Sequence, residues 1–263
     1  MKQVAAANRN SRKNSSPVGP NANAVLLILC CFLLVPFRVS AQDSASTPVV
    51  SDDFNWTALE GSEPWPSELT EVNNLPEAPT ELARLLQAGQ VAFKFYDAQN
   101  LRRTFTGETR MAMKYTIDVR FRWRLVRAAG KRKLAVTVQH QPTRFEMFHQ
   151  ILLPLDHANA QMYAAPLVLH ELDHVRIAVD PRYPAQFEEW FQAATKSLTI
   201  ELDSRTKESE FAALIQAEIQ AKSVPCFEKM LQLIQIRNRE LDRQTQHGRV
   251  PLAEDFFGRD EEH

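Results

Sequence analysis

Apolar and polar residues alternate over a long stretch in the first half of the chain, which predicts a half-buried β-strand. From Met111 to Leu125 every second residue is apolar, and those between are polar or small. This two-residue period is typical of a strand with one face in a core. A glycine-containing turn at 128–132 and a second alternating stretch at 134–138 complete a predicted hairpin. A shorter strand is predicted beside it at 91–96.

The spacing of apolar residues changes to three and four after Pro154, which predicts helices. We expect them over 158–179, over 185–222, and from Pro225 to about Leu241. Pro166 fits the first turn of a helix but not its interior, so we expect a helix start near Ala165 or a kink there. The predicted fold class is α+β, with a small antiparallel β-sheet followed by a helical half.

The second half also carries an H-E-x-x-H motif, His170-Glu171-Leu172-Asp173-His174. Residues four apart lie on one face of a helix, so both imidazoles can reach a single metal ion. Two imidazoles and an open position suit Zn²⁺, and Glu171 is placed to act as the general base that activates water. The motif predicts a zinc-binding helix and a hydrolase, most often a peptidase.

Two histidines make a weak zinc site, so a third protein ligand is expected. The sequence leaves three alternatives open. Asp180 stands six residues after the second histidine, just before a helix-ending proline. A glutamate of the next helix, Glu188 or Glu189, is the second alternative. The third is His247, which follows the last predicted helix and precedes Gly248, where a sharp turn is possible.

The start of the chain has the pattern of an export signal. Residues 1–23 are basic and contain no acidic residue, residues 24–37 are apolar, and Val39-Ser40-Ala41 is a small-residue cleavage site. An apolar run of this length is short for a spanning helix and usual for a signal peptide. We therefore predict a signal peptide over 1–41 and a secreted, periplasmic or cell-envelope protein. An uncleaved membrane anchor is the alternative.

The rest of the chain divides by composition. Residues 42–80 are rich in Ser, Pro, Asp and Glu and are expected to form a loosely ordered lead-in. The α+β domain is predicted over 81–257, and 258–263 form a charged tail. Without residues 1–41, the chain has 26 basic and 32 acidic residues, a net charge of −6. This balance argues against a nucleic-acid partner. Cys226 is then the single cysteine, which excludes an intrachain disulfide.

Several of these features together resemble a family of bacterial secreted proteins identified as predicted zinc-dependent proteases. They are the export signal, the hairpin, H-E-x-x-H followed by V-R-I-A at 175–178, a single cysteine opening a late helix, and D-x-x-T-x-H-G at 242–248. The resemblance covers roughly residues 90–250. It implies that His247 completes the zinc site. Leu241 departs from the family, which commonly has tyrosine before the aspartate.

The function expected from the sequence is an exported zinc-dependent peptidase acting on a peptide or protein, with His170, His174 and His247 around the metal and Glu171 as the base. Asp242 or Asp180 is expected to orient the imidazoles. Candidates for stabilising an oxyanion, which the sequence does not rank, are Tyr163, Tyr183 and Arg176. The alternative function is a non-catalytic exported zinc-binding structural or envelope interaction protein.

Overall fold

The computed structural model describes residues 38–39, 69–98 and 107–258. By its internal contacts the chain divides into two units, Met1–Leu33 and Leu34–His263, and all described residues belong to the second. Most of the predicted signal peptide and lead-in, and the tail from residue 259 on, therefore lie outside the described residues. Among the residues that are described, no helix is long and apolar enough to cross a membrane.

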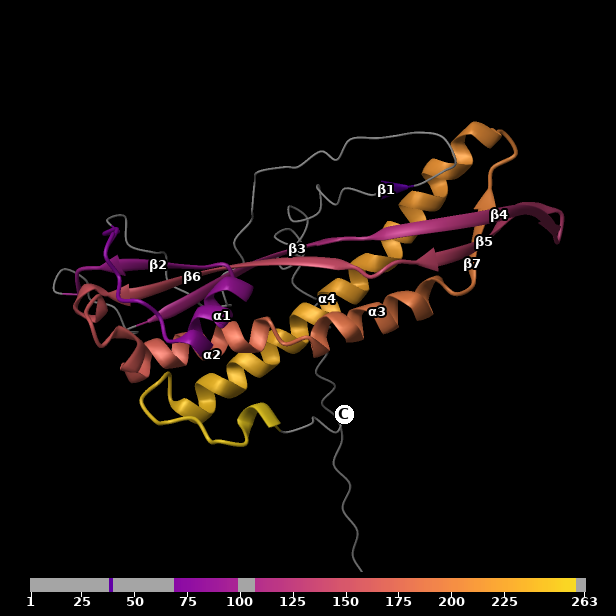
Figure 1. Cartoon of the computed structure of the whole chain (residues 1–263). Helices are drawn as coiled ribbons and strands as arrows, with labels where there is room; N and C mark the ends of the chain where they lie inside the picture. The colour runs from indigo at the N-terminus through magenta and orange to yellow at the C-terminus, as the bar shows by residue number, and fades with distance from the viewer. Residues whose placement is uncertain (1–37, 40–68, 99–106, 259–263) are drawn as a thin grey trace, which may run out of the picture. The chain divides into compact units, whose positions relative to one another are not determined.

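One long hairpin forms the framework of the fold (Figure 1). Its first arm consists of β3 (Glu108–Thr116) and β4 (Asp118–Ala128), and its second arm of β5 (Lys131–His140) and β6 (Arg144–Pro154). The two arms are antiparallel throughout. Ala129 and Gly130, with φ of 52° and 75°, form the two-residue turn that joins them. The predicted hairpin is confirmed, and β6 is an addition that the sequence analysis did not anticipate.

The hairpin is divided into two sheets near its middle. Thr116 pairs with Arg144 and Val119 with His140, so two residues of the first arm stand opposite three of the second. Such an extra residue bends a strand and interrupts its pairing. The resulting sheets have the strand orders β2-β6-β3 and β1-β4-β5-β7.

Three short strands extend these sheets. The predicted strand at 91–96 is confirmed as β2 (Val91–Tyr96), and it runs parallel to β6. β7 (Leu198–Leu202) runs antiparallel to β5, and β1 (Arg38–Val39) runs parallel to β4.

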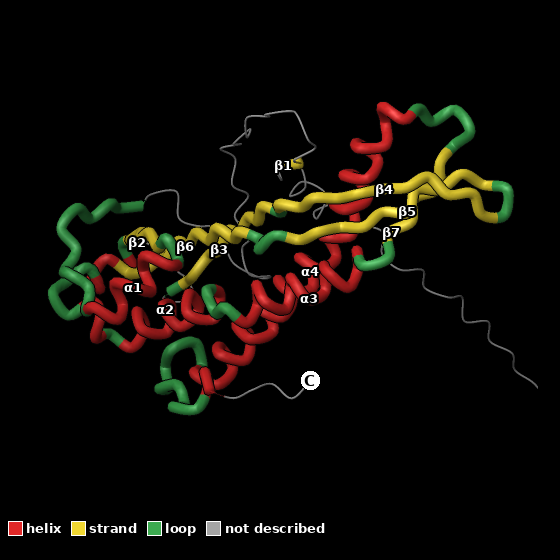
Figure 2. Tube along the Cα trace, turned by 45° about the vertical axis from the view of Figure 1, so that its right-hand side comes forward, coloured by secondary structure: helices red, strands yellow, loops and turns green. Residues whose placement is uncertain are grey.

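Helices cover one face of the hairpin (Figures 1 and 2). They are α1 (Thr80–Ala88), α2 (Pro166–Ala178), α3 (Arg182–Thr195) and α4 (Phe211–Thr245). Pro166 is the first residue of α2, as its missing N–H favours. Residues 162–164 before it form a short 3-10 turn, so the H-E-x-x-H motif lies in a new helix and does not follow a kink.

The single helix predicted over 185–222 is wrong in its middle but right at both ends. Residues 185–195 belong to α3 and 211–222 to α4, with the strand β7 between them. Leu198 and Leu202 are buried against the main core and Ile200 between them is partly buried, whereas Thr199 and Glu201 are exposed, and this two-residue alternation favours the strand. Pro225 does not open a helix as predicted but lies inside α4. Its missing backbone donor is tolerated because α4 packs along the core on both sides of it, through Ile219 and Met230.

Two apolar clusters hold the helices on the sheets. The larger one contains side chains of the strands β3, β4, β5 and β7 and of the helices α2, α3 and α4, with Leu134 and Phe187 fully buried. The smaller one joins β2 and β6 to α2, from Val168 to Val175. α2 belongs to both, since Leu172 packs in the smaller cluster and Ile177 in the larger. The H-E-x-x-H motif therefore lies where the two clusters meet. With its two sheets and the helices that cover them, the fold confirms the predicted α+β class.

Candidate metal centre

α2 places His170 and His174 side by side. Each is 5% exposed, and the centroids of the two rings are 4.8 Å apart. The four-residue spacing explains this arrangement, because the two side chains leave the same face of the helix one turn apart. The geometry predicted for the two histidines of the motif is confirmed.

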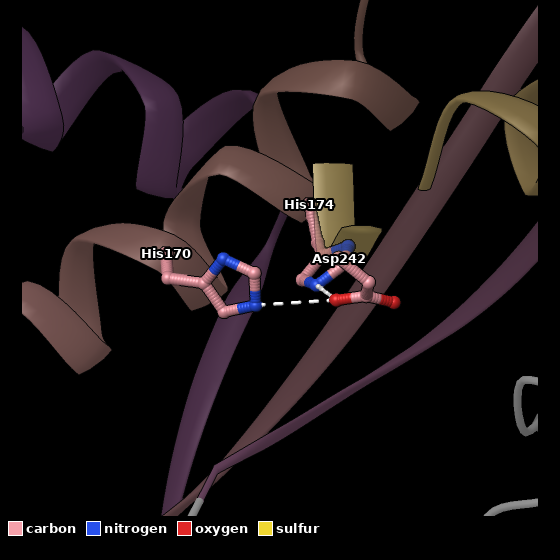
Figure 3. Close-up of side chains that lie close together, drawn as sticks. All are labelled: His170, His174 and Asp242. Atoms are coloured by element: carbon pink, nitrogen blue, oxygen red, sulfur yellow. Dashed lines mark ion pairs between the residues drawn. The ribbon is translucent and has the colours of Figure 1, made fainter. Parts of the chain in front are cut away.

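Asp242, near the end of α4, brings a carboxylate to the two rings (Figure 3). Its Oδ1 lies 3.3 Å from Nε2 of His170 and 3.2 Å from Nε2 of His174. The three ligand atoms all lie within 4.8 Å of one another, so the group could hold a metal ion. Ligands around a tetrahedral zinc ion, with bonds of about 2.0–2.1 Å, are separated by roughly 3.3 Å. The two nitrogen–oxygen distances, 3.3 and 3.2 Å, therefore suit such a site.

The other nitrogen of each ring is held by a neighbour of Asp242 on the same face of α4. Nδ1 of His174 lies 3.1 Å from Oδ1 of Asn238, and Nδ1 of His170 lies 3.2 Å from the Thr245 hydroxyl. That hydroxyl donates its own hydrogen to the carbonyl of Leu241, so it accepts from the ring. Both Nδ1 atoms are thus donors, which leaves both Nε2 atoms to face the carboxylate. Partners of this kind fix the tautomer of metal-binding histidines.

Charge is concentrated at the centre. Burial opposes protonation of His174, but the hydrogen bond to Asp242 and the charge of Glu171 outweigh it and raise the pKa of His174 to about 9. Burial likewise opposes ionisation of Asp242, yet its hydrogen bonds to both histidines hold the pKa of its carboxyl well below the usual range. For both Nε2 atoms to donate to Asp242, each ring would have to carry a second proton. A metal ion satisfies the same three atoms without those protons.

Glu171 is buried next to this group, with 3% of its surface exposed. The Thr109 hydroxyl on β3 lies 2.6 Å from its Oε2 and donates to it. Gly107 provides room for the carboxylate, because a Cβ there would lie 2.5 Å from Oε1. Burial raises the pKa of Glu171 against the opposing charges of His174 and His170. A raised pKa brings a carboxylate closer to the range in which it works as a general base near neutral pH.

The structure does not include His247 in the three-residue group. Gln246 and His247 both have a left-handed backbone, with φ of 50° and 55°, and the His247 side chain is 65% exposed. Its Nδ1 nevertheless lies 3.4 Å from Oδ1 of Asp242, so it contacts the carboxylate that faces the other two rings. The assignment of His247 as a ligand stays a prediction.

The other candidates of the sequence analysis lie elsewhere. Asp180 forms an ion pair with Arg182 at the start of α3, where it also accepts from the Arg182 backbone N–H. Glu188 accepts from the backbone N–H of Thr143. Among the oxyanion candidates, Arg176 pairs with Asp173 and Tyr163 packs edge-on against Phe93.

Three residues of the centre received no role from the sequence. Asn238 and Thr245 stand four before and three after Asp242, the spacing that places side chains on one helical face. Once Asp242 is placed beside the histidines, this spacing predicts that Asn238 and Thr245 also face them. Thr109 has no such signal, because it contacts Glu171 from 62 residues away.

Gly248 packs against His170, and this contact can be tested. A Cβ at Gly248, whose φ is +78°, would lie 2.9 Å from Cβ of His170. Gly130 has a similar φ of +75° with nothing within 4 Å, so it is a matched control for backbone strain. We expect Gly130→Ala to lower the free energy of unfolding by about 1 kcal/mol. Gly248→Ala should lower it further and should also weaken metal binding.

Chemical denaturation and zinc titration of both variants would measure these effects. Equal losses of stability, together with unchanged metal binding in Gly248→Ala, would show that the contact with His170 is unimportant.

Comparisons with protein-family models, with curated proteins and with solved structures give no match. The resemblance to the family of secreted zinc-dependent proteases therefore stays an expectation from the sequence.

Proposed function

We propose that this protein is a zinc-dependent hydrolase, a peptidase by the usual chemistry of its motif, that acts after export from the cytoplasm. One observation carries the proposal. Two buried imidazoles, whose Nδ1 atoms are both held by acceptors, direct their Nε2 atoms to one carboxylate, beside a buried glutamate. A structural zinc site has no use for that glutamate, whereas hydrolysis needs a base at this position.

The donor set fits zinc. Two histidines and a carboxylate occur together in catalytic zinc sites, where a fourth position is left open. We propose His170, His174 and Asp242 as the ligands, with His247 as the alternative to Asp242. Asn238 and Thr245 would keep the two rings in the tautomer that offers Nε2.

When bound, zinc acts as a Lewis acid that makes water acidic enough to react near neutral pH and polarises a carbonyl. Glu171 would take the proton from the attacking water and pass it to the leaving amine. Thr109 orients the Glu171 carboxylate by donating to its Oε2. The missing side chain at Gly107 leaves room for the other oxygen, Oε1.

The proposal is tested by elemental analysis of the purified protein followed by a peptide-library screen. We expect about one zinc per chain and cleavage that stops on chelation and returns when zinc is added. A His170→Ala variant should lose both properties. Zinc without cleavage would favour the non-catalytic zinc-binding protein, and the absence of zinc after reconstitution would contradict both.

A further inference from the structure

His149 is a buried histidine that the proposed mechanism does not use. It lies in the middle of β6 with 1% of its surface exposed. Its Nδ1 is 2.7 Å from the carbonyl oxygen of Gly89 and must donate to it, since a carbonyl can only accept. Gly89 permits this approach, because a Cβ there would lie 3.1 Å from Nδ1 and 2.5 Å from Val175.

The other ring nitrogen of His149 has no hydrogen-bond partner among the described residues, although it is buried. Burial lowers the pKa of His149 to about 4, outweighing the effect of the bond to Gly89. The ring is therefore neutral near pH 7, and Nε2 carries a free lone pair. A buried acceptor without a donor is costly, so native proteins satisfy such atoms, in many cases with an ordered water.

Next to His149 is a cavity of about 30 Å³ between the sheet and the helices α2 and α4. Most of its lining is apolar, with Met111 and Ile234 among the residues that supply it, and the polar residues at its wall include His149, His174 and Asn238. A buried water needs roughly 10–15 Å³ and two to four polar partners. The cavity has room for one or two.

We propose that this cavity is a buried hydration site in which a water molecule donates to Nε2 of His149 and accepts from the amide nitrogen of Asn238. In the resulting chain of hydrogen bonds, each bond has one donor and one acceptor. Gly89 accepts from His149, His149 accepts from the water, the water accepts from Asn238, and Asn238 accepts from Nδ1 of His174. His149 is thus a positioning residue.

The hydration site fixes which way the Asn238 amide points. If its nitrogen is engaged by the water, its oxygen must face His174, and His174 must then offer Nε2 to the metal. This consequence for zinc rests on the proposed function, but the water itself does not.

The experiment has two parts. A crystal structure at a resolution that shows ordered water should reveal one within hydrogen-bond distance of both atoms. Zinc affinity, measured by competition with a chelating dye, should fall about tenfold in His149→Phe, at the low end of the effects of outer-shell partners. His149→Gln should stay close to wild type, because its amide oxygen can take the place of Nε2. His140→Phe, which alters a partly buried histidine bonded to Thr195, is the control and should not change affinity.

A dry cavity in the wild-type crystal structure would overturn the proposal, as would wild-type affinity in His149→Phe. Equal losses in the Phe and Gln variants would also overturn it, since they would indicate lost packing and not a lost acceptor. If His149→Phe does not fold, the wild-type crystal structure decides. A wild-type protein that binds no zinc would contradict the proposed function, and the crystal structure would still decide on the water.

Discussion

Replacing Glu171 with glutamine is expected to leave zinc bound and to lower the rate of peptide hydrolysis by about 10²–10⁴-fold, the usual contribution of a general base. Glutamine has the same size and keeps an oxygen that can accept from Thr109, so the fold and the histidine pair should be retained. It cannot take a proton from water. The loss should therefore appear in kcat, with metal content unchanged.

The matched control for this variant is Glu189→Gln on α3. Glu189 is exposed and was one of the glutamates considered as a third ligand. We expect wild-type metal content and wild-type hydrolysis from it. Full activity in Glu171→Gln with zinc present would show that another group is the base. Loss of zinc in that variant would instead place the Glu171 carboxylate among the metal ligands.

The parts of the site that the sequence predicted are those set by local geometry. A four-residue spacing in a helix determines that His170 and His174 meet, and a proline at the first helical position determines where that helix can begin. Both follow from residues close together in the chain. The hairpin was predictable for the same reason, because its alternation and its turn lie within one continuous stretch.

The parts that the sequence did not predict depend on packing between distant segments. β7 was taken for helix because its few residues lie between two helical patterns, and its strand conformation depends on pairing with β5. Asn238 meets His174 across 64 residues, and Thr245 meets His170 across 75. Their role depends on the crossing of α2 and α4, which no spacing within either helix reveals.

The motif D-x-x-T-x-H-G is an intermediate case. The sequence assigned its histidine to the metal, whereas the structure assigns distinct contacts to the other members. Asp242 faces both Nε2 atoms, Thr245 accepts from His170, and Gly248 packs against the same ring. All three residues contact the histidines of the H-E-x-x-H motif. These contacts explain why the aspartate, the threonine and the glycine stand at these positions in D-x-x-T-x-H-G.

The Asp242→Ala variant is expected to lose zinc almost completely, with affinity lowered by more than about 100-fold. Changes to partners outside the ligand set already cost about 10–100-fold, and Asp242 lies in direct reach of both histidines. His247→Ala should lower affinity much less, since that side chain is largely exposed and does not belong to the three-residue group. Zinc titration of the two variants side by side measures the difference.

The comparison distinguishes the two candidate ligands because Asp242→Ala and His247→Ala leave different sets of side chains to hold the zinc ion. Without Asp242, the two buried rings face each other with no carboxylate between them, and a zinc ion would have to be held by His170, His174 and His247. Retention of zinc in Asp242→Ala together with its loss in His247→Ala would therefore establish the three-histidine site that the sequence predicts. Loss in both variants would make Asp242 and His247 joint ligands, and the fourth position that hydrolysis needs would then be filled by the protein.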